Sequence, residues 1–288
     1  MTKKRIIFII NPISGGKSKQ NIPGLIEALL DQTKYEYTIS YTKYPGHAKE
    51  LAAQNGFDFY VAVGGDGTLN EVASQLINTQ KCMGILPMGS GNGLARHMGI
   101  SMDVKQSIIQ LNKAKIYEID TCTLNGYPFI NMAGVGFDAH IGKLFAESKE
   151  RGFKTYIAQT LTEFKSYTPH KYKLIFDGHE IVSEAFLISF ANSSQYGNNA
   201  HIAPKADIFD GQLNVCVMKP FNLLTGLGIG FKLFNKTINS SSYMKSFVTQ
   251  ELVVERETEG ITHVDGEPIH MGKVLEIKVL PKSLKLLA

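Results

Sequence analysis

The alternation of strand-like and helix-like segments in the first part of the chain constrains the fold most strongly. Strands are predicted at residues 6–10, 35–41, 59–63 and 83–86, and amphipathic helices at 22–30, 47–55, 70–77 and 104–112. This βαβα order is typical of a mostly parallel sheet covered by helices. The sequence therefore predicts an α/β domain at the N-terminal end of the chain.

The pattern changes near residue 117, where strand-like runs bounded by Gly, Asn or Asp begin to follow one another. These runs are IYEIDTCTLNG, PFINMAGVG, YKLIFDGHEI, EAFLISFAN, QLNVCVM and THVDGEPI. They predict a second, mainly antiparallel β domain. We place the boundary near Thr121, which gives domains at 1–121 and 122–283, with residues 284–288 as candidates for completing the first domain.

Two segments of the second domain, 142–166 and 221–238, look helical instead. The latter carries large apolar residues together with Lys232 and Lys236, so it is a candidate for leaning on a membrane or lining an acyl-chain cleft. Core packing is the alternative. Its three glycines, at 226, 228 and 230, weaken the prediction of a continuous helix.

Composition and charge exclude several classes of protein. A chain of 288 residues with 43% hydrophobic and 19% charged residues is globular rather than disordered. The net charge of +4, without a run of five or more Lys or Arg, predicts no nucleic-acid partner. Isolated cysteines predict neither a disulfide framework nor a zinc site. No apolar stretch reaches the roughly 20 residues of a membrane span, so we expect a cytoplasmic protein without a transmembrane segment.

The first strand ends in the glycine-rich sequence NPISGGKS, which begins at Asn11. It resembles a phosphate-binding P-loop, but Asn11 occupies the position of the first Gly in GxxxxGK[ST], so a true P-loop is not predicted. A glycine-rich turn between a strand and a helix still offers backbone N–H groups to phosphate. A plain strand-to-helix turn is the alternative.

Two more glycine turns follow later strands. In VAVGGDGTLNEV, Asp66 lies among glycines at the end of an apolar strand, where open α/β sheets bind ligands. Thr68 and Glu71 have capping-box spacing, so a tight turn with a helix cap is the alternative. In ILPMGSGNGLAR, Ser90 and Asn92 lie among glycines at the same predicted edge. Together the three turns predict a nucleotide site.

These blocks, with the later NMAGVGFDA, DGQLNV and VDGEP, resemble the diacylglycerol kinase catalytic-domain family. The family includes bacterial soluble lipid kinases and the sphingosine and ceramide kinases. The resemblance extends in family order from residue 6 to about residue 286. GGDGT alone is shared with NAD kinases and relatives of phosphofructokinase, whereas its combination with NPxSG and PxGSGNxLAR is highly specific. The implied fold is an NAD kinase/phosphofructokinase-like α/β domain followed by a β-sandwich-like domain that takes the lipid.

The resemblance implies an ATP- and Mg²⁺-dependent lipid kinase that phosphorylates a hydroxyl of a diacylglycerol- or sphingoid-base-like lipid at a membrane surface. A homodimer is a further expectation. The positions that match the family's ATP contacts are Asn11, Pro12, Ser14, Gly15, Thr42, Gly64, Gly65, Asp66, Gly67, Thr68, Asn70, Glu71, Gly89 and Ser90. An NAD-kinase-like enzyme with a soluble substrate and a catalytically silent nucleotide- or lipid-binding protein are the alternatives.

By the same resemblance, Glu267 in VDGEP corresponds to the general base, with Asp66 as the rival candidate. Asp66 and Asp120 correspond to acids of the magnesium–water network. A second, structural Mg²⁺ is implied through the carboxylate of Asp210 and the carbonyls of Asp207 and Gln212. Asp265-Gly266 and Asp210-Gly211 are also ordinary turn signals, which is the alternative for both motifs.

Substrate recognition is where the chain departs from part of the family. Asp138, in GVGFDA, matches a position that contacts the lipid head group in sphingosine kinases. The third turn has SGNG where many bacterial diacylglycerol kinases resemble TxND, so Gly93 supplies no acid and the sequence weakly favours sphingoid lipids.

A possible dinucleotide motif, GxGxxA, is formed by Gly134, Gly136 and Ala139. These residues do not follow the first strand of a βαβ unit, so no dinucleotide site is predicted there.

Overall fold

The computed structural model describes residues 2–16, 18–147 and 160–288, which divide into two compact units. Unit 1 consists of Met1–Ile119 and Lys282–Ala288, and unit 2 consists of Asp120–Pro281. Among the described helices, none is both long enough and apolar enough to cross a membrane.

Unit 1 contains the parallel sheet that the sequence predicts. Its strands are β1 (Lys4–Ile10), β2 (Tyr35–Tyr41), β3 (Phe59–Gly64), β4 (Cys82–Pro87) and the end of β16 (Val274–Leu287). They lie in the order β2-β1-β3-β4-β16, and every pair runs parallel. β3 and β4 are buried along their whole length, as expected of central strands covered on both faces.

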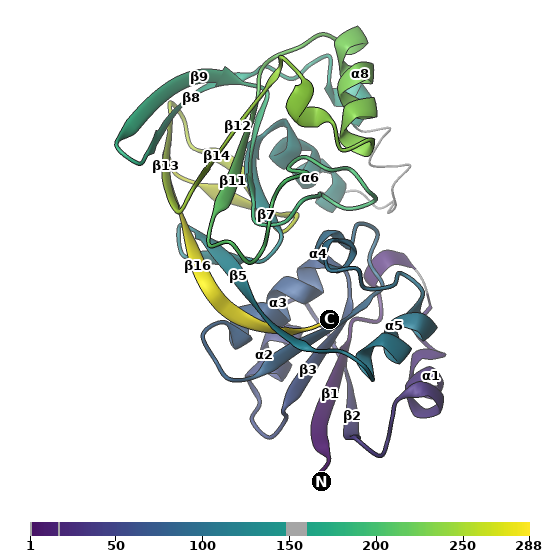
Figure 1. Ribbon diagram of the computed structural model, residues 1–288. Helices are drawn as coiled ribbons and strands as arrows, with labels where there is room; N and C mark the ends of the chain where they lie inside the picture. The colour runs from purple at the N-terminus through teal and green to yellow at the C-terminus, as the bar shows by residue number, and fades with distance from the viewer. Residues whose placement is uncertain (1, 17, 148–159) are drawn as a thin grey trace. The chain divides into compact units, whose positions relative to one another are not determined.

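Helices cover both faces of this sheet (Figure 1). They are α1 (Ile22–Leu29), α2 (His47–Ala53), α3 (Asp66–Leu76), α4 (Gly93–His97) and α5 (Val104–Leu111). α1 and α5 pack on one face and share a core with β1, β3 and β4, whereas α2 and α3 pack together on the other. α3 begins at Asp66 rather than at residue 70, and the short α4 was not predicted, because glycines at both helix starts lower helix propensity.

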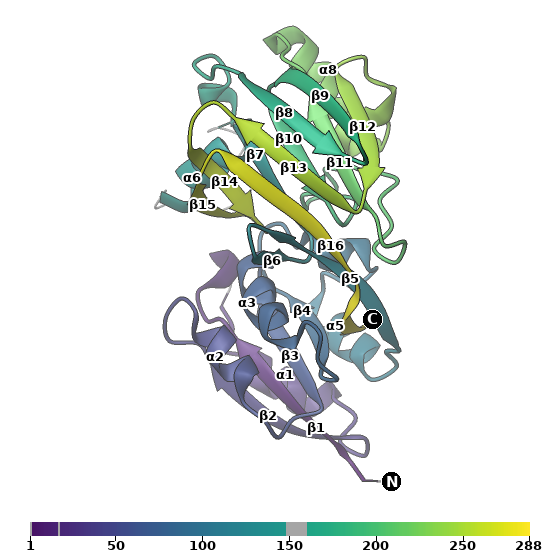
Figure 2. The ribbon, with the colours of Figure 1, turned by 90° about the vertical axis from the view of Figure 1, so that its left-hand side faces the viewer.

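Unit 2 is an antiparallel β-sandwich, which confirms the predicted second fold class. One sheet contains β5 (Ile116–Leu124), β6 (Tyr127–Phe129), β8 (His170–Phe176), β9 (His179–Ala185), β13 (Glu251–Arg256) and β16. The other contains β7 (Met132–Gly136), β10 (Leu187–Ala191), β11 (Leu213–Met218), β12 (Met244–Thr249), β14 (Gly260–Val264) and β15 (Glu267–Met271). Figure 2 shows β9, β8, β13 and β16 side by side in the first sheet.

The core of the sandwich lies between the two sheets. Inward residues such as Tyr172 and Leu252 from one sheet meet Ile188 and Phe190 from the other. This arrangement follows from the alternation of buried and exposed positions along strands such as β13. The alternation therefore determines which face of each strand enters the core.

The helices of unit 2 lie outside the sandwich core and pack on the outer face of the second sheet. α6 (Phe137–Glu147) begins five residues before the predicted segment 142–166, of which residues 148–159 fall outside the described residues. α8 (Leu223–Phe234) is one continuous helix within the predicted helical segment, and its glycines, which weaken the sequence prediction, do not interrupt it. Two contacts explain this. The Asn222 side chain caps the helix by accepting from Thr225 N at 2.9 Å, and Gly226 leaves space for the ring of Phe221.

Candidate functional site

The first two glycine turns of unit 1 are joined by a hydrogen bond between side chains. Asn11 Nδ2 donates to Thr68 Oγ1 at 3.0 Å, and Asn11 Oδ1 accepts from Ile13 N at 3.1 Å. The backbone N–H of Asn11 also donates to the carbonyl of Val63 at 3.0 Å. Thr68 is buried within α3, so its predicted role as a helix cap is wrong. Its hydroxyl instead anchors the first turn.

The third turn packs backbone to backbone against the other two. A Cβ on Gly89 would lie 2.4 Å from the Cα of Gly65, and a Cβ on Gly15 would lie 2.1 Å from the carbonyl oxygen of Met88. Gly15 also has a φ of 60°, a conformation that favours glycine. Any side chain at these positions would push the turns apart. The glycines therefore bring the backbone of three strand ends together at one edge of the parallel sheet.

Asp66 holds the third turn in place. Its Oδ2 accepts from Asn92 N at 3.0 Å, and its Oδ1 accepts from Gly93 N at 3.1 Å. Asn92 in turn closes a small ring with Gly89, since Gly89 N donates to Asn92 Oδ1 and Asn92 Nδ2 donates to Gly89 O, both at 2.9 Å. Both oxygens of the Asp66 carboxylate are therefore engaged by backbone at the start of α4.

Glu71 plays the same part for α2. Its two carboxylate oxygens accept from Gly46 N and Ala48 N, each at 3.0 Å, so it caps α2 and not its own helix. This corrects the capping box expected from the sequence. The segment ahead of α2 is tied to the sheet because Thr42 N donates to the carbonyl of Ile10 at 2.9 Å.

The remaining predicted nucleotide contacts lie on the same turns or in the first turns of α3. Pro12 and Ser90 are exposed, and the half-buried Ser14 donates from its hydroxyl to the carbonyl of Asn11 at 3.2 Å. Gly64, Gly67 and Asn70 complete the set. Gly64 is required by packing, because a Cβ there would lie 2.6 Å from Thr68 Oγ1.

In unit 2, a buried polar cluster forms around Asp138 at the start of α6. Its Oδ2 lies 3.2 Å from His263 Nε2, 3.2 Å from Ser189 Oγ and 3.2 Å from Tyr196 OH. Ser189 and His263 both pair with Gly134 across neighbouring strands, so their side chains flank a position that has none. Asp138 fills the space above Gly134. The missing side chain of this glycine is therefore what admits the carboxylate.

The Asp210-Gly211 turn and Asp120 lie together. Asp120 is buried at 1% exposure, and its Oδ2 accepts from Gly211 N at 2.6 Å. Asp207 and Asp210 accept from Phe209 N at 3.0 Å and Gln212 N at 2.8 Å, which closes the loop on itself. Burial raises the pKa of the Asp210 carboxyl, and the charges of Asp207 and Asp120 raise it further. The loop thus holds three acidic side chains within electrostatic reach of one another.

The predicted hairpin signal in VDGEP is a turn between β14 and β15. Asp265 and Gly266 have φ values of 48° and 86°, as a two-residue hairpin turn requires. Asp265 is buried, and its carboxylate accepts three backbone N–H groups, from Ile130, Asn131 and Met132, at 2.9 to 3.0 Å. Glu267 is exposed at the start of β15. The hairpin therefore presents Glu267 on a rigidly anchored turn.

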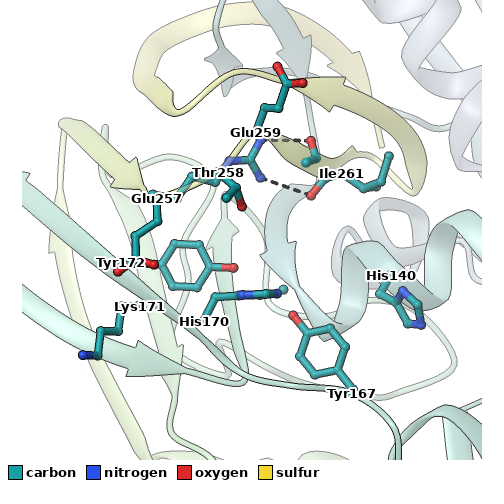
Figure 3. A pocket seen from close by; sticks show the side chains of 12 residues that line it. His140, Tyr167, His170, Lys171, Tyr172, Glu257, Thr258, Glu259 and Ile261 are labelled. Carbon is teal, nitrogen blue, oxygen red and sulfur yellow. Dashed lines mark hydrogen bonds between the residues drawn. The ribbon is translucent and has the colours of Figure 1, made fainter.

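A cavity of about 320 Å³ opens in unit 2 beside the residues that flank Asp138 in sequence (Figure 3). Its lining is rich in rings and cations and comprises Gly136, His140, Tyr167, His170, Lys171, Tyr172, Arg256, Glu257, Thr258, Glu259, Gly260 and Ile261. Burial raises the pKa of Tyr172 to about 12, so this phenol is neutral at physiological pH. Arg256 donates to the carbonyls of Gly260 at 2.9 Å and Met271 at 2.6 Å. The cavity wall thus combines apolar and polar groups and is braced by a guanidinium.

Family models account for most of the chain. The diacylglycerol kinase catalytic domain matches residues 5–124, and the YegS C-terminal NAD kinase beta sandwich-like domain matches residues 131–288. The chain belongs to the diacylglycerol kinase catalytic-domain family. The predicted family is therefore confirmed.

Individual relatives of this family agree along nearly their whole length. "Diacylglycerol kinase" of Bacillus subtilis (strain 168) is 28% identical, with 97% of each chain covered. "Probable lipid kinase YegS-like" of Pectobacterium atrosepticum is 30% identical, with 95% of each chain covered. A solved structure described as a diacylglycerol kinase from Bacillus anthracis str. Sterne has a TM-score of 0.76 at 19% identity, covering 100% of this chain and 97% of that chain. The last likeness shows the shared fold.

Some residues of the candidate sites were not found by sequence reasoning. His263, Ser189, Tyr196 and Asp265 carry the buried polar contacts of unit 2. Ser189 and Tyr196 stand in segments without a motif. The strand register brings Ser189 beside Asp138, and Tyr196 reaches Asp138 from the segment that follows β10. Asp265 did carry a signal, because an acid before Gly in a hairpin can turn its carboxylate toward nearby amides. Among the described residues, no three His, Cys, Asp or Glu side chains gather as metal ligands.

Proposed function

We propose that this chain is an ATP-dependent lipid kinase that transfers the γ-phosphoryl group of ATP to a hydroxyl of a diacylglycerol- or sphingoid-base-like lipid. The observation that carries the proposal is the meeting of three glycine turns at one edge of a parallel sheet, in a chain of the diacylglycerol kinase catalytic-domain family. A kinase of this family implies ATP as the phosphoryl donor. Relatives named diacylglycerol kinase and probable lipid kinase support a lipid as the acceptor.

The turns supply the donors that nucleotide phosphates need. Phosphoryl transfer depends on positioning and on stabilising the charge of the phosphate oxygens, more than on covalent chemistry by the protein. The backbones at Gly15, Gly65 and Gly89 approach neighbouring turns without side chains between them, which suits a multiply charged phosphate. We assign the ATP phosphates to this edge, with Ser90 and Thr42 beside them.

We assign the general base to Glu267 rather than to Asp66. Both oxygens of Asp66 accept backbone N–H groups from the third turn, so its carboxylate is used in positioning that turn. Glu267 is exposed on a hairpin that Asp265 anchors. In the proposed step, the oxygen of the lipid hydroxyl bonds to the γ-phosphorus while Glu267 accepts the proton of that hydroxyl. The bond from that phosphorus to the bridging β,γ-oxygen breaks, and ADP leaves.

The loop at residues 207–212 has the donor chemistry for Mg²⁺. Mg²⁺ prefers carboxylate, carbonyl and water oxygens. The negative charges of Asp207, Asp210 and Asp120 repel one another, and a bound cation would reduce this repulsion. Bound Mg²⁺ would neutralise negative charge. We propose that Asp210, with the carbonyls of Asp207 and Gln212, holds this ion, and that Asp120 fixes the loop through Gly211 N. A role of Asp120 in the catalytic magnesium–water network is a further proposal.

Unit 2 takes the lipid in this proposal, with Asp138 contacting the polar head group. The carboxylate is held by His263, Ser189 and Tyr196, so it has a fixed direction from which to accept a hydroxyl or amine hydrogen. The cavity lined by Gly136 and His140, which flank Asp138 in sequence, offers polar groups and room for a head group. Since the acceptor is an insoluble lipid, peripheral contact with a membrane surface is part of the proposal.

The experiment that tests this function measures ADP release from ATP and Mg²⁺ by the purified chain. Diacylglycerol, sphingoid base and ceramide are offered in mixed micelles, and NAD is offered in solution. We expect turnover on one lipid that falls by at least about a thousandfold in Glu267→Gln, as loss of a catalytic base predicts. Glu251→Gln, which also changes an exposed Glu at the start of a strand, is the matched control and should keep full activity.

Other outcomes of the same assay would reject the proposal. Turnover of NAD without turnover of any lipid would indicate a soluble-substrate kinase. Absence of all turnover, with ATP still bound, would indicate a silent binding protein. Full activity of Glu267→Gln would reject only the assignment of the base and would return Asp66 to that role.

A further inference from the structure

Helix α8 presents a continuous apolar stripe to solvent. Five large apolar side chains are exposed on it, with exposed fractions of 40% for Leu223, 81% for Leu224, 67% for Leu227, 71% for Phe231 and 47% for Phe234. At about 100° per residue, these positions fall within an arc of about 100° on one side of the helix. Single exposed apolar residues are ordinary on protein surfaces, but a stripe of this size marks an interaction site.

The opposite side of α8 is held firmly against unit 2. Ile229 is buried and packs in the cluster on the outer face of the second sheet. Lys232 Nζ donates to the hydroxyl and carbonyl oxygens of Ser240, at 3.1 and 3.3 Å. Because the helix packs on unit 2 through its other face, the apolar stripe cannot turn inward to pack in the core of that unit. Figure 1 shows α8, in green, on the periphery of that unit.

The stretch of chain that contains α8 carries charge of one sign. Residues 211–250 contain four lysines, Lys219, Lys232, Lys236 and Lys245, and no Asp or Glu. The chain as a whole is nearly balanced, with 30 Lys and Arg against 26 Asp and Glu, so this stretch is exceptional. Apolar side chains beside lysines without acids are the pattern of helices that lie in the interface of an anionic membrane.

We propose that α8 docks unit 2 on an anionic phospholipid bilayer, with Leu224, Leu227 and Phe231 entering the acyl boundary and the exposed Lys236, just past the end of the helix, meeting lipid phosphates. This inference rests on the proposed function, since a lipid acceptor has to be reached at such a surface. A second copy of the chain fits the stripe less well. A two-fold contact through α8 would place the same stretch of chain, which carries lysines and no acids, against itself.

Vesicle binding tests the proposal without any turnover. The full chain is sedimented with vesicles of phosphatidylcholine alone and of phosphatidylcholine with about a third phosphatidylglycerol, in the absence of ATP. We expect binding to the anionic vesicles that weakens with added salt. Leu227→Ser/Phe231→Ser should bind about tenfold more weakly or worse, because two apolar side chains no longer enter the interface. Leu227→Ser alone is compared with Val182→Ser, a residue of β9 with the same 67% exposure, which should bind as the unchanged protein does.

Two further measurements keep the result interpretable. Turnover of lipid in detergent micelles should be unchanged in the α8 variants, so a defect on vesicles alone separates docking from catalysis. Light scattering reports the oligomeric state. Failure of the unchanged protein to bind anionic vesicles, or equal binding by the double variant, would overturn the proposal. Conversion of a dimer to a monomer by the double variant, with vesicle binding intact, would also overturn it and assign α8 to an interface between copies.

Discussion

Asp138 and His263 meet over a glycine, with Asp138 Oδ2 3.2 Å from His263 Nε2. A Cβ on Gly134 would lie 2.8 Å from each of these two atoms. The pair is almost wholly buried, and the Nδ1 atom of His263 has no hydrogen-bond partner among the described residues. A glycine in the middle of a strand is costly, so its place here follows from the polar pair that it admits.

Substitution of this glycine should therefore destabilise the protein. In Gly134→Ala, the added methyl group would lie 2.8 Å from Asp138, from His263 and from the carbonyl of Ile188. We expect a loss of about 2 kcal/mol in the free energy of unfolding, measured by urea denaturation. Gly142→Ala in α6 is the control, since its methyl group would meet only Gly266 O at 3.9 Å, and its stability should be unchanged or higher. Equal stability of the two variants would contradict this account.

Removing the charge of Asp138 should affect the lipid and not ATP. In Asp138→Asn the side chain keeps its shape but loses the negative charge shared by His263, Ser189 and Tyr196. We expect KM for the lipid to rise about tenfold or more, with KM for ATP unchanged. Steady-state kinetics in mixed micelles measure both constants. A parallel rise of both would indicate a general structural defect and not a contact with the head group.

Asp265 should contribute much more to the stability of the protein than Asp177, the matching aspartate of another hairpin turn. Asp265 and Asp177 both have a φ of 48° before a Gly, but only Asp265 is buried with its carboxylate accepting three N–H groups. Asp265→Asn replaces one acceptor oxygen by a donor facing those amides, and we expect a loss of about 3 kcal/mol in denaturant unfolding. Asp177→Asn, in an exposed turn, should change stability by less than about 0.5 kcal/mol.

The Asp210 loop should make stability depend on both pH and Mg²⁺. Burial and the nearby charges of Asp207 and Asp120 raise the pKa of Asp210 in the folded state. Without a divalent cation, the stabilising contribution of protonated Asp210 is fully present below the unfolded pKa. It is lost as pH rises through the higher folded pKa. At neutral pH, saturating Mg²⁺ should raise the thermal midpoint by about 5 °C.

Asp210→Asn separates the two effects. This variant should be more stable than the unchanged protein without Mg²⁺ at neutral pH and should gain nothing from Mg²⁺. Asp177→Asn, whose aspartate lies in another turn of unit 2, should keep the full Mg²⁺ response. A Mg²⁺ shift that survives in Asp210→Asn would remove this loop as the binding site.

Local sequence patterns predicted the fold class because they report which faces of each element are apolar. The unbroken apolar runs of β1 and β3 predicted a sheet covered on both sides, and this is confirmed. The starts of α3 and α4 were missed because residues such as Asp66 and Gly93 are held by contacts between distant turns. Glu71 was assigned to its own helix for the same reason, since its partners are 23 and 25 residues away.

Candidate site residues were predictable where a motif marks them and not where register alone brings them in. Asp138 and Asp210 lie in motifs and were found, whereas Ser189 is in a plain apolar strand and becomes part of a polar cluster only through pairing with Gly134. α8 shows that contacts within the fold can outweigh a low intrinsic helix propensity. Its glycines lower intrinsic helix stability, but a cap at Asn222 and packing of Ile229 compensate.

The strand β16 makes the completion of unit 1 depend on residues far along the chain. Leu286 pairs with Met83 of β4, while residues nearer the start of the same strand pair with β13 in unit 2. During synthesis, the sheet of unit 1 therefore stays open at β4 until residues 282–288 have been added, although its other strands are complete by residue 87. An exposed sheet edge invites pairing with other chains. The nascent chain consequently passes through a stage in which an almost finished sheet carries an unpaired edge.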